Sequence, residues 1–278
     1  MYWLFINAST GDAQAQPLSI DTLRRLATSI EGPAPSEVRY ESIAYREVRS
    51  NLLVAGTGLR EMKFFVRAYQ LVVPGKRPIL VDAGIAPGRQ GTREFRGFDR
   101  EAQNHVNRAL ESASQVVLLG EAPWHTGALS QRSVESAVWP GESPRAIAPG
   151  VVSIPANGLS GRPQMLYVRL ENGGELLFTG AAAMTDQAWR EVRPPARYRP
   201  EFSGGNDREV IASWLMTINA LHKQAPDMTV VPGQQPGDLR EFDQLLKGFK
   251  SPGQGRSQNA GQATGHKPRD NVLARRKS

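Results

Sequence analysis

Five apolar runs in this chain each end directly in a loop of small or turn-forming residues, and this pattern constrains the fold more than any other feature. The runs are "ILV" before residues 82–84, "VVLL" before 120–127, "VVSI" before 155–163, "ELLFT" before 180–185 and "MTVV" before 232–237. Short apolar runs bounded by Gly and Pro are typical of buried strands. If these strands end at one edge of the fold, the five loops meet there and form a cleft on a rigid scaffold, where binding residues are often found.

The rest of the chain predicts helices between further strands. Strands are expected at residues 38–45 and 64–73, a β-hairpin at 164–179 around the turn "ENGG", and helices at 18–30, 99–112, 207–223 and 238–249. The helix at 18–30 should present Leu23, Leu26 and Ile30 on one face. Strands followed by helices and then by strands again predict a mixed α/β layered domain.

Charge and composition divide the chain into three parts. Residues 251–278 hold six basic residues against one acid, so +5 of the formal charge of +7 lies in this tail. The tail is rich in Gly, Gln and Ser, which favours a solvated, disordered end over a nucleic-acid-binding arm. Residues 38–250 form the expected domain. Residues 1–37 form an N-terminal segment with a short helix, and its "AQAQ" resembles the end of an export signal whose apolar run, Tyr2 to Ile6, is truncated.

Two absences restrict the chemistry. The chain has no cysteine, which excludes disulfides, thiolate zinc sites and cysteine nucleophiles. It has no run of 18 apolar residues, so no membrane span is expected, and either a cytoplasmic or an exported location stays open. Nucleophile elbows, Walker-type phosphate loops and dinucleotide fingerprints are also absent from the sequence.

The order of these pieces resembles the metallo-β-lactamase fold, and especially its lactonase-like branch, over roughly residues 38–250. The matching stretches are "RSNLLVAGTGLREM", "ILVDAGI", "VVLLGEAPWHTGALS", "ELLFTGAAAMT" and "MTVVPGQQPGDL". The resemblance implies a four-layer αββα sandwich. It also implies one or two zinc ions held by a His-x-His-x-Asp-His loop, by further histidines and by a bridging Asp, which together activate a water for attack on a carbonyl.

Residue by residue, the chain departs from this ligand set. The positions that match family ligands are Gly120, Ala122, Trp124, His125, Asn157, Ala181 and Gln234. Of these, only His125 keeps a ligand of the family type, and Asp82 matches a carboxylate that supports the ligands. Zinc needs at least three N, O or S donors, and the whole chain has four histidines. Glycine, alanine and the indole N–H supply no such donor.

These observations leave two interpretations of the loops. The first, which we favour, is a hydrolase-like protein that has lost most zinc ligands, is non-catalytic or repurposed, and needs no cofactor. The alternative is an active hydrolase for a lactone or another ester or amide, with an atypical mononuclear zinc site or a metal-free site. In the alternative, His125 and Glu121 are the catalytic candidates, and His125 is the one candidate metal ligand.

A purely structural interpretation is also open, in which each loop residue only stabilises its own loop. His125 then hydrogen-bonds its own loop, Glu121 is solvated, and Asn157 and Gln234 satisfy backbone groups. Trp124 fills the space of the missing ligands or stacks on a ligand. The sequence names no small-molecule partner and no oligomeric state.

Overall fold

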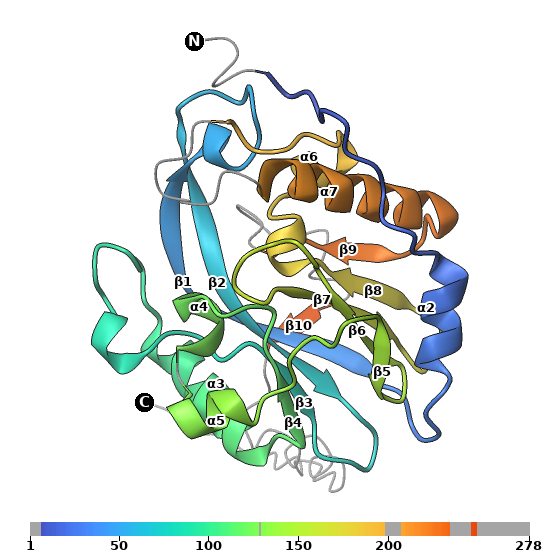
Figure 1. Cartoon of the computed structure of the whole chain (residues 1–278). Helices are drawn as coiled ribbons and strands as arrows, with labels where there is room; N and C mark the ends of the chain where they lie inside the picture. Colours follow the sequence, from blue (N-terminus) through green and yellow to red (C-terminus); the bar gives the residue numbers. More distant parts are fainter. Residues whose placement is uncertain (1–6, 128, 198–206, 234–245, 249–278) are drawn as a thin grey trace, which may run out of the picture.

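The computed structural model describes residues 7–127, 129–197, 207–233 and 246–248. Within them, two five-stranded β-sheets pack face to face (Figure 1). In spatial order, sheet A contains β10 (Leu246–Gly248), β1 (Glu37–Arg49), β2 (Glu61–Val72), β3 (Ile79–Val81) and β4 (Gln115–Val117). Sheet B contains β5 (Arg145–Ala148), β6 (Val151–Pro155), β7 (Gln164–Arg169), β8 (Glu175–Phe178) and β9 (Thr229–Val231).

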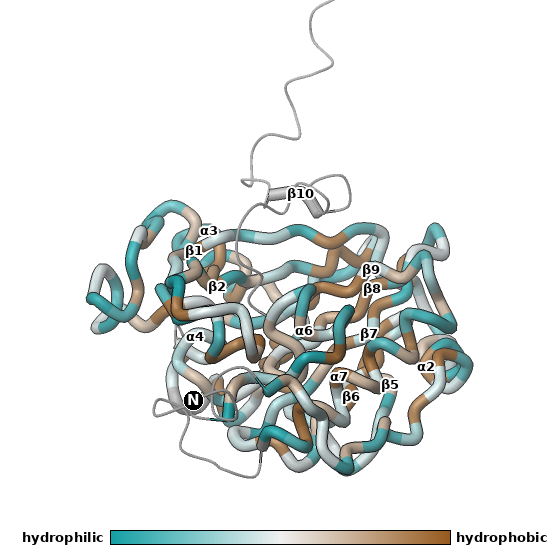
Figure 2. The backbone as a smooth tube through the Cα atoms, turned by 90° about the horizontal axis from the view of Figure 1, so that it is seen from above, coloured by the Kyte–Doolittle hydropathy of each residue, from teal (hydrophilic) through white to brown (hydrophobic). Residues whose placement is uncertain are grey.

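Helices cover the outer faces of both sheets. Helices α2 (Ile20–Ala27) and α7 (Asp207–Gln224) bury their apolar sides against sheet B, and α3 (Arg100–Ser112) covers sheet A. A third apolar cluster, which includes Tyr69 and Phe178, lies between the sheets. In Figure 2 the apolar segments gather around β7, β8 and β9, and hydrophilic segments lie mostly at the periphery. The layers run helix, sheet, sheet, helix, which confirms the expected α/β sandwich.

The helices follow the apolar spacing of the sequence. Helix α7 matches the predicted helix at 207–223 and buries Trp214, Leu215, Ile218 and Leu221. No helix in the described part of the chain is both long and apolar enough to cross a membrane. Helix α3 begins after Asp99, whose carboxylate accepts hydrogen bonds from the backbone N–H groups of Glu101 and Ala102 in the first turn.

Helix α2 is shorter than predicted. It begins after Ser19 and ends at Ala27, so Ile30 lies beyond it and is 38% exposed instead of sharing the buried face of Leu23. The helix packs into the same core as α7 and sheet B, although it lies in the predicted N-terminal segment. The division of the chain at residue 38 stays a prediction.

The β1–β2 hairpin is longer than the sequence indicates. The strands predicted at 38–45 and 64–73 are parts of a twelve-pair antiparallel ladder that runs from Glu37 and Val72 to Arg49 and Glu61, with one bulge between Ser42 and Ala44. The charged stretch at the end of β1 hides its strand character, because charges are depleted in strands and pairing with β2 overrides that preference.

Two further strands correct the sequence analysis. Residues 246–248 fall in the helix predicted at 238–249, yet they form β10, parallel to Val38–Tyr40 of β1. Apolar spacing in a short segment cannot show that a sheet edge is available, and that edge supplies the hydrogen bonds here. The other described strand that was not predicted is β5, which pairs with β6. The remainder of the predicted helix and the tail at 251–278 lie outside the described residues.

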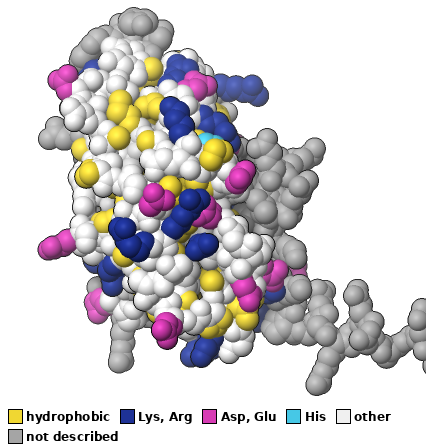
Figure 3. Space-filling model, turned by 90° about the vertical axis from the view of Figure 1, so that its right-hand side faces the viewer, with side chains coloured by type: hydrophobic (Ala, Val, Ile, Leu, Met, Phe, Trp, Pro, Cys, Tyr) yellow, Lys and Arg dark blue, Asp and Glu magenta, His cyan; other side chains and the backbone are white. Residues whose placement is uncertain are grey.

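An ion pair connects α2 to sheet B. Figure 3 shows the side of the molecule on which α2 lies in Figure 1, and charged side chains of both signs intermingle there. Arg24 donates from Nε and Nη2 to the two carboxylate oxygens of Glu175, each at 2.7 Å. The hydroxyl of Tyr167 also donates to Glu175. The Arg24 hydrogen bonds hold the pKa of Glu175 below its ordinary value, and burial raises the pKa of Tyr167.

Because of this ion pair, the stability of the fold depends on pH in the acid range. Because its pKa is depressed in the folded state, Glu175 stabilises the fold fully above the unfolded-state pKa of about 4.3, and this stabilisation is lost as the pH falls below that value. We expect Glu175→Gln to lower the free energy of unfolding by about 1–2 kcal/mol at pH 7, measured by urea denaturation. The deficit should shrink below pH 4. Glu31→Gln, at an exposed position, should change little, and a pH-independent deficit for Glu175→Gln would contradict the assignment.

Candidate functional site

The five loops that the sequence singled out meet at one edge of the sandwich, which we call the loop edge (residues 82–84, 120–127, 155–163, 180–185 and 232–233 of the described chain). Three backbone hydrogen bonds join neighbouring loops: Ala83 N to His125 O at 2.8 Å, Glu121 N to Gly161 O at 3.0 Å, and Gly233 N to Ala183 O at 3.0 Å. These bonds join the first three loops to one another and the fourth loop to the fifth. Gly180 of the fourth loop packs on Leu119 and Gln164, which adjoin the second and third loops, so the expected convergence is observed.

Two glycines allow the last two loops to reach this junction. A Cβ at Gly233 would lie 2.1 Å from the carbonyl oxygen of Gly180, which no side chain tolerates. Gly180 itself has a φ of +50°, and its Cβ would lie 2.9 Å from the carbonyl oxygen of Gln164. Glycine adopts this conformation at little cost, so the backbones of the two loops pack directly on each other and on β7.

A buried amide side chain joins the two sheets beside the loop edge. Gln164, at the start of β7, donates from Nε2 to the carbonyl oxygens of Leu118 (2.6 Å) and Val138 (2.9 Å). Its Oε1 accepts from the hydroxyl of Ser153 at 2.5 Å. The sequence analysis missed Gln164. The signal that could have found it is a polar residue opening an otherwise apolar strand, because a buried amide needs partners on every side.

Asp82 links the first loop of the loop edge to the second. It follows β3 and has a φ of +62°, a conformation that Asp and Asn tolerate better than most residues. Its Oδ1 accepts from Leu119 N at 2.9 Å, and its Oδ2 lies 2.8 Å from Nδ1 of His125. Both side chains are almost fully buried. This carboxylate therefore fixes the start of the second loop and the ring of His125.

His125 lies in the short helix α4 (Pro123–Thr126), inside the second loop. Its backbone N–H donates to Ala122 O, and its carbonyl accepts from Ala83 N. The ring is thus held through both its backbone and Nδ1. No described residue forms a hydrogen bond with its Nε2.

Trp124 packs toward α3. Its ring lies 4.5 Å from the guanidinium of Arg46, and it joins the apolar cluster on the outer face of sheet A with Phe95 and Ile85. The indole ring therefore belongs to the α3 layer.

Two of the remaining predicted site residues, Glu121 and Asn157, contact groups other than His125. Glu121 is exposed and lies 3.5 Å from Arg162, so Asp82, and not Glu121, is the carboxylate that contacts His125. The amide of Asn157 donates to Glu142 O at 3.2 Å. Ala181 lies in a 3-10 turn over Gly180–Ala182. Gln234 lies outside the described residues.

A zinc ion of the family type does not fit these donors. Gly120, Ala122, Trp124 and Ala181 offer no side-chain ligand. Because Nδ1 of His125 is bonded to Asp82, Nε2 is the one ring nitrogen of His125 that could bind a metal. Among the described residues, no group of three or more His, Cys, Asp or Glu could hold a metal ion. Tetrahedral zinc requires at least three such donors.

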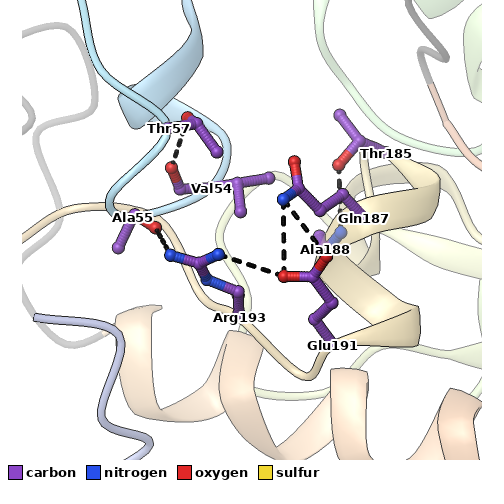
Figure 4. A network of polar contacts seen from close by, with 8 residues as sticks. All are labelled: Val54, Ala55, Thr57, Thr185, Gln187, Ala188, Glu191 and Arg193. Atoms are coloured by element: carbon purple, nitrogen blue, oxygen red, sulfur yellow. Dashed lines mark hydrogen bonds and ion pairs between the residues drawn. The ribbon is translucent and has the colours of Figure 1, made fainter. Parts of the chain in front are cut away.

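A second network fixes the segment beside the loop edge (Figure 4). Arg193 follows the short helix α6 (Asp186–Arg190) and donates from Nη2 to Ala55 O at 2.7 Å, while its Nη1 pairs with Glu191 at 3.0 Å. The amide of Ala55 donates to Pro194 O at 2.9 Å. These bonds attach the tip of the β1–β2 hairpin, residues 50–60, to the segment that follows the fourth loop.

The two face-to-face sheets, the flanking helices and the loop edge define the class: the chain has the metallo-β-lactamase fold, with lactonases and metal-dependent hydrolases as its structural neighbours. One neighbour is a quorum-quenching N-acyl homoserine lactone lactonase, with a TM-score of 0.61 and 16% identity over 78% of this chain and 97% of that chain.

Two further solved structures support the same fold. An N-acyl homoserine lactone hydrolase, with the product N-hexanoyl-L-homoserine at its catalytic metal centre, gives a TM-score of 0.58 and 14% identity over 78% of this chain and 98% of that chain. A probable metal-dependent hydrolase from Staphylococcus aureus gives a TM-score of 0.56 and 11% identity over 74% of this chain and 91% of that chain. No protein-family description and no curated protein matches the sequence.

Loss of the Gln164 amide should destabilise the junction of the sheets. Gln164→Leu keeps most of the volume but leaves two carbonyls and one hydroxyl without this partner, so we expect the free energy of unfolding to fall by about 2–4 kcal/mol. The control is Gln187→Leu, whose exposed amide bonds only to Glu191 and should change stability by less than about 0.5 kcal/mol. Equal effects in urea denaturation would refute the role of Gln164.

Loss of the Arg193 guanidinium should loosen the hairpin tip. In Arg193→Ala, we expect amide hydrogen exchange at residues 50–60 to accelerate roughly tenfold, because one charged hydrogen bond to the tip is removed. The matched control is Arg190→Ala. Arg190 stacks on Trp189 and pairs with Asp186 without touching the tip. Unchanged exchange in Arg193→Ala would show that the backbone bonds alone hold the tip.

Proposed function

We propose that this protein uses a lactonase-type fold without zinc-dependent hydrolysis, and that its loop edge is a non-catalytic or repurposed site for a small molecule. The observation that carries the proposal is the shortage of donors around His125: among the described residues, no group of three or more His, Cys, Asp or Glu could hold a metal ion. His125 is the one matching ligand that the described chain keeps, and Asp82, whose Oδ2 lies 2.8 Å from its Nδ1, supports its ring.

The surroundings of this pair support the proposal. A two-zinc centre collects histidines and carboxylates from several loops, whereas here the equivalent loops bring glycine and alanine close to His125. Asn157, the polar candidate in the third loop, is engaged with Glu142 O. In the fourth loop, Ala181 brings no donor side chain, and Gln234, the matching position of the fifth loop, lies outside the described residues.

Metal content tests the proposal directly. The protein, purified without a histidine tag, is incubated with excess zinc, passed through a desalting column and measured by elemental mass spectrometry. We expect clearly substoichiometric zinc, equal in the wild-type protein and in His125→Ala. About one zinc per chain that His125→Ala loses would overturn the proposal. Zinc retained by both proteins would place the metal away from His125 and leave the proposal standing.

A second candidate function, hydrolysis without metal, is favoured by one observation. Asp82 orients His125 in the way that an acid orients a general base in hydrolytic enzymes. The described residues near the pair do not include a serine or threonine nucleophile bonded to the ring, and Glu121 pairs with Arg162 instead. A His-activated water would be the attacking group.

Lactone turnover separates the two candidates. N-hexanoyl homoserine lactone, the substrate that corresponds to the product bound in a structural neighbour, is incubated with the chelator-treated protein. We expect hydrolysis at the uncatalysed rate. Turnover that His125→Ala abolishes and Glu121→Ala retains would establish the second candidate and contradict a non-catalytic role.

A further inference from the structure

We propose that a second site, remote from the loop edge, binds a free α-amino acid with an apolar side chain. The site is a cavity of about 520 Å³ between the chain that follows α2, the β5–β6 turn and the β7–β8 turn, which we call the far-end cavity. Arg169 binds the carboxylate of the ligand, Glu31 and Glu171 attract its ammonium group, and apolar walls receive its side chain. The cavity lies at the opposite end of β6 and β7 from the loop edge, so this inference goes beyond the proposed function and does not depend on it.

Backbone hydrogen bonds hold the walls of the far-end cavity together. Gly150 N donates to Ala27 O at 2.9 Å, Arg169 N donates to Gly150 O at 2.8 Å, and Glu171 N donates to Pro35 O at 2.9 Å. Gly150 has a φ of +74°, and a Cβ there would lie 2.5 Å from the carbonyl oxygen of Arg169. Glycine permits this close approach. The cavity is therefore formed by packed backbone before a ligand arrives, as most small-molecule sites are.

Arg169 supplies a positive charge that the fold leaves available. Glu175 faces it across the β7–β8 ladder. The carboxylate of Glu175, however, already accepts two hydrogen bonds from Arg24 and one from the hydroxyl of Tyr167. Within the described part of the chain, the partly buried Arg169 side chain forms no hydrogen bond or ion pair of its own. A guanidinium binds a carboxylate through two parallel N–H groups, so Arg169 can hold the carboxylate of a ligand.

Two carboxylates in the same cavity select for a ligand that carries both charges. Glu31 and Glu171 are exposed, and neither pairs with Arg169 or with another cation of the described chain. A simple anion would bind Arg169 but would also face both carboxylates, and a simple cation would face the guanidinium. An α-amino acid carries its carboxylate and its ammonium group on one carbon atom, so each charge meets a complementary partner.

Apolar side chains form much of the remaining wall. Ile30, Pro33, Pro149 and Leu170 line the cavity. Ile30 is 38% exposed and is one of two large apolar side chains that are exposed in the described chain. An apolar ligand side chain that covers this surface removes it from water, which favours binding. The ligand class is therefore an apolar amino acid such as leucine.

Four small molecules separate the contributions of the two charges and of the side chain. L-Leucine, N-acetyl-L-leucine, L-leucinamide and glycine are titrated into the full chain, and backbone ¹H–¹⁵N spectra are recorded. We expect L-leucine to give saturable shifts at residues 27–34 and 169–173, with a dissociation constant on the order of 1 mM. N-Acetyl-L-leucine lacks the ammonium group, L-leucinamide lacks the carboxylate and glycine lacks the apolar side chain. Each should bind about tenfold more weakly than L-leucine.

The variant Arg169→Gln tests the carboxylate contact. We expect its affinity for L-leucine to fall about tenfold, because one charged contact is lost. The matched control is Arg25→Gln. Arg25 is an exposed arginine of α2 that contacts Thr22 and does not line the cavity, so this variant should bind L-leucine as the wild-type protein does.

The variant Glu171→Gln tests the ammonium contact at an exposed position. It should weaken the binding of L-leucine and leave that of N-acetyl-L-leucine unchanged, because the acetylated compound has no ammonium group. The spectra without ligand show whether each variant keeps the fold of the wild-type protein.

Three results would overturn the inference. They are the absence of saturable shifts with L-leucine, shifts confined to residues away from the far-end cavity, and equal affinities of the wild-type protein and a folded Arg169→Gln for L-leucine. Equal binding of L-leucine and N-acetyl-L-leucine would remove the role of the carboxylates and refute a zwitterionic ligand. None of these results bears on zinc content, which tests the proposed function separately.

Discussion

The loop edge depends on backbones that approach more closely than side chains would allow. The Gly233 backbone packs on the Gly180 carbonyl, and Gly180 in turn packs on the start of β7. Carbonyl groups become buried beside such a junction, and each then needs a hydrogen-bond donor. The Gln164 amide donates to the carbonyl oxygens of Leu118 and Val138 and so connects β7 to the chain beyond β4. The second loop, which carries His125, starts just after Leu118, whose carbonyl Gln164 holds, and Asp82 is bonded to the next residue, Leu119.

Much of the fold could be predicted because its strands are short, apolar and terminated by small residues. The runs at 79–81 and 115–117, for example, form the parallel pair β3–β4, in which all of β3 and Val117 of β4 are buried, and such strands need no alternation of polar residues. Strands that depend on a partner for their identity were missed. The charged end of β1 and the three residues of β10 have no strand signal of their own, and their pairing comes from neighbours distant in sequence.

The candidate site was predicted in part. The sequence indicated Asp82 and His125, but the carboxylate that it offered as a partner for the histidine was Glu121, four positions earlier in the chain, beside the preferred interpretation of a solvated Glu121. In the structure, Asp82 reaches His125 across 43 residues, since parallel pairing of β3 with β4 places the first and second loops side by side. The sequence does not show that Glu121 faces Arg162. Gln164 stands out in the sequence only as a polar residue that opens an apolar strand, and the carbonyl groups of Leu118 and Val138 that it bonds cannot be foreseen from residue types.

The parallel pairing of β10 with β1 has a consequence for biosynthesis. The strand that covers the outer edge of β1 comes from residues 246–248, about two hundred positions after the strand that it protects. A nascent chain emerging from the ribosome therefore carries β1 with open backbone donors and acceptors until nearly all of the domain has been translated. Exposed edges of this kind recruit other strands. This topology therefore makes the nascent chain depend most on chaperones during translation, while the edge of β1 is still open.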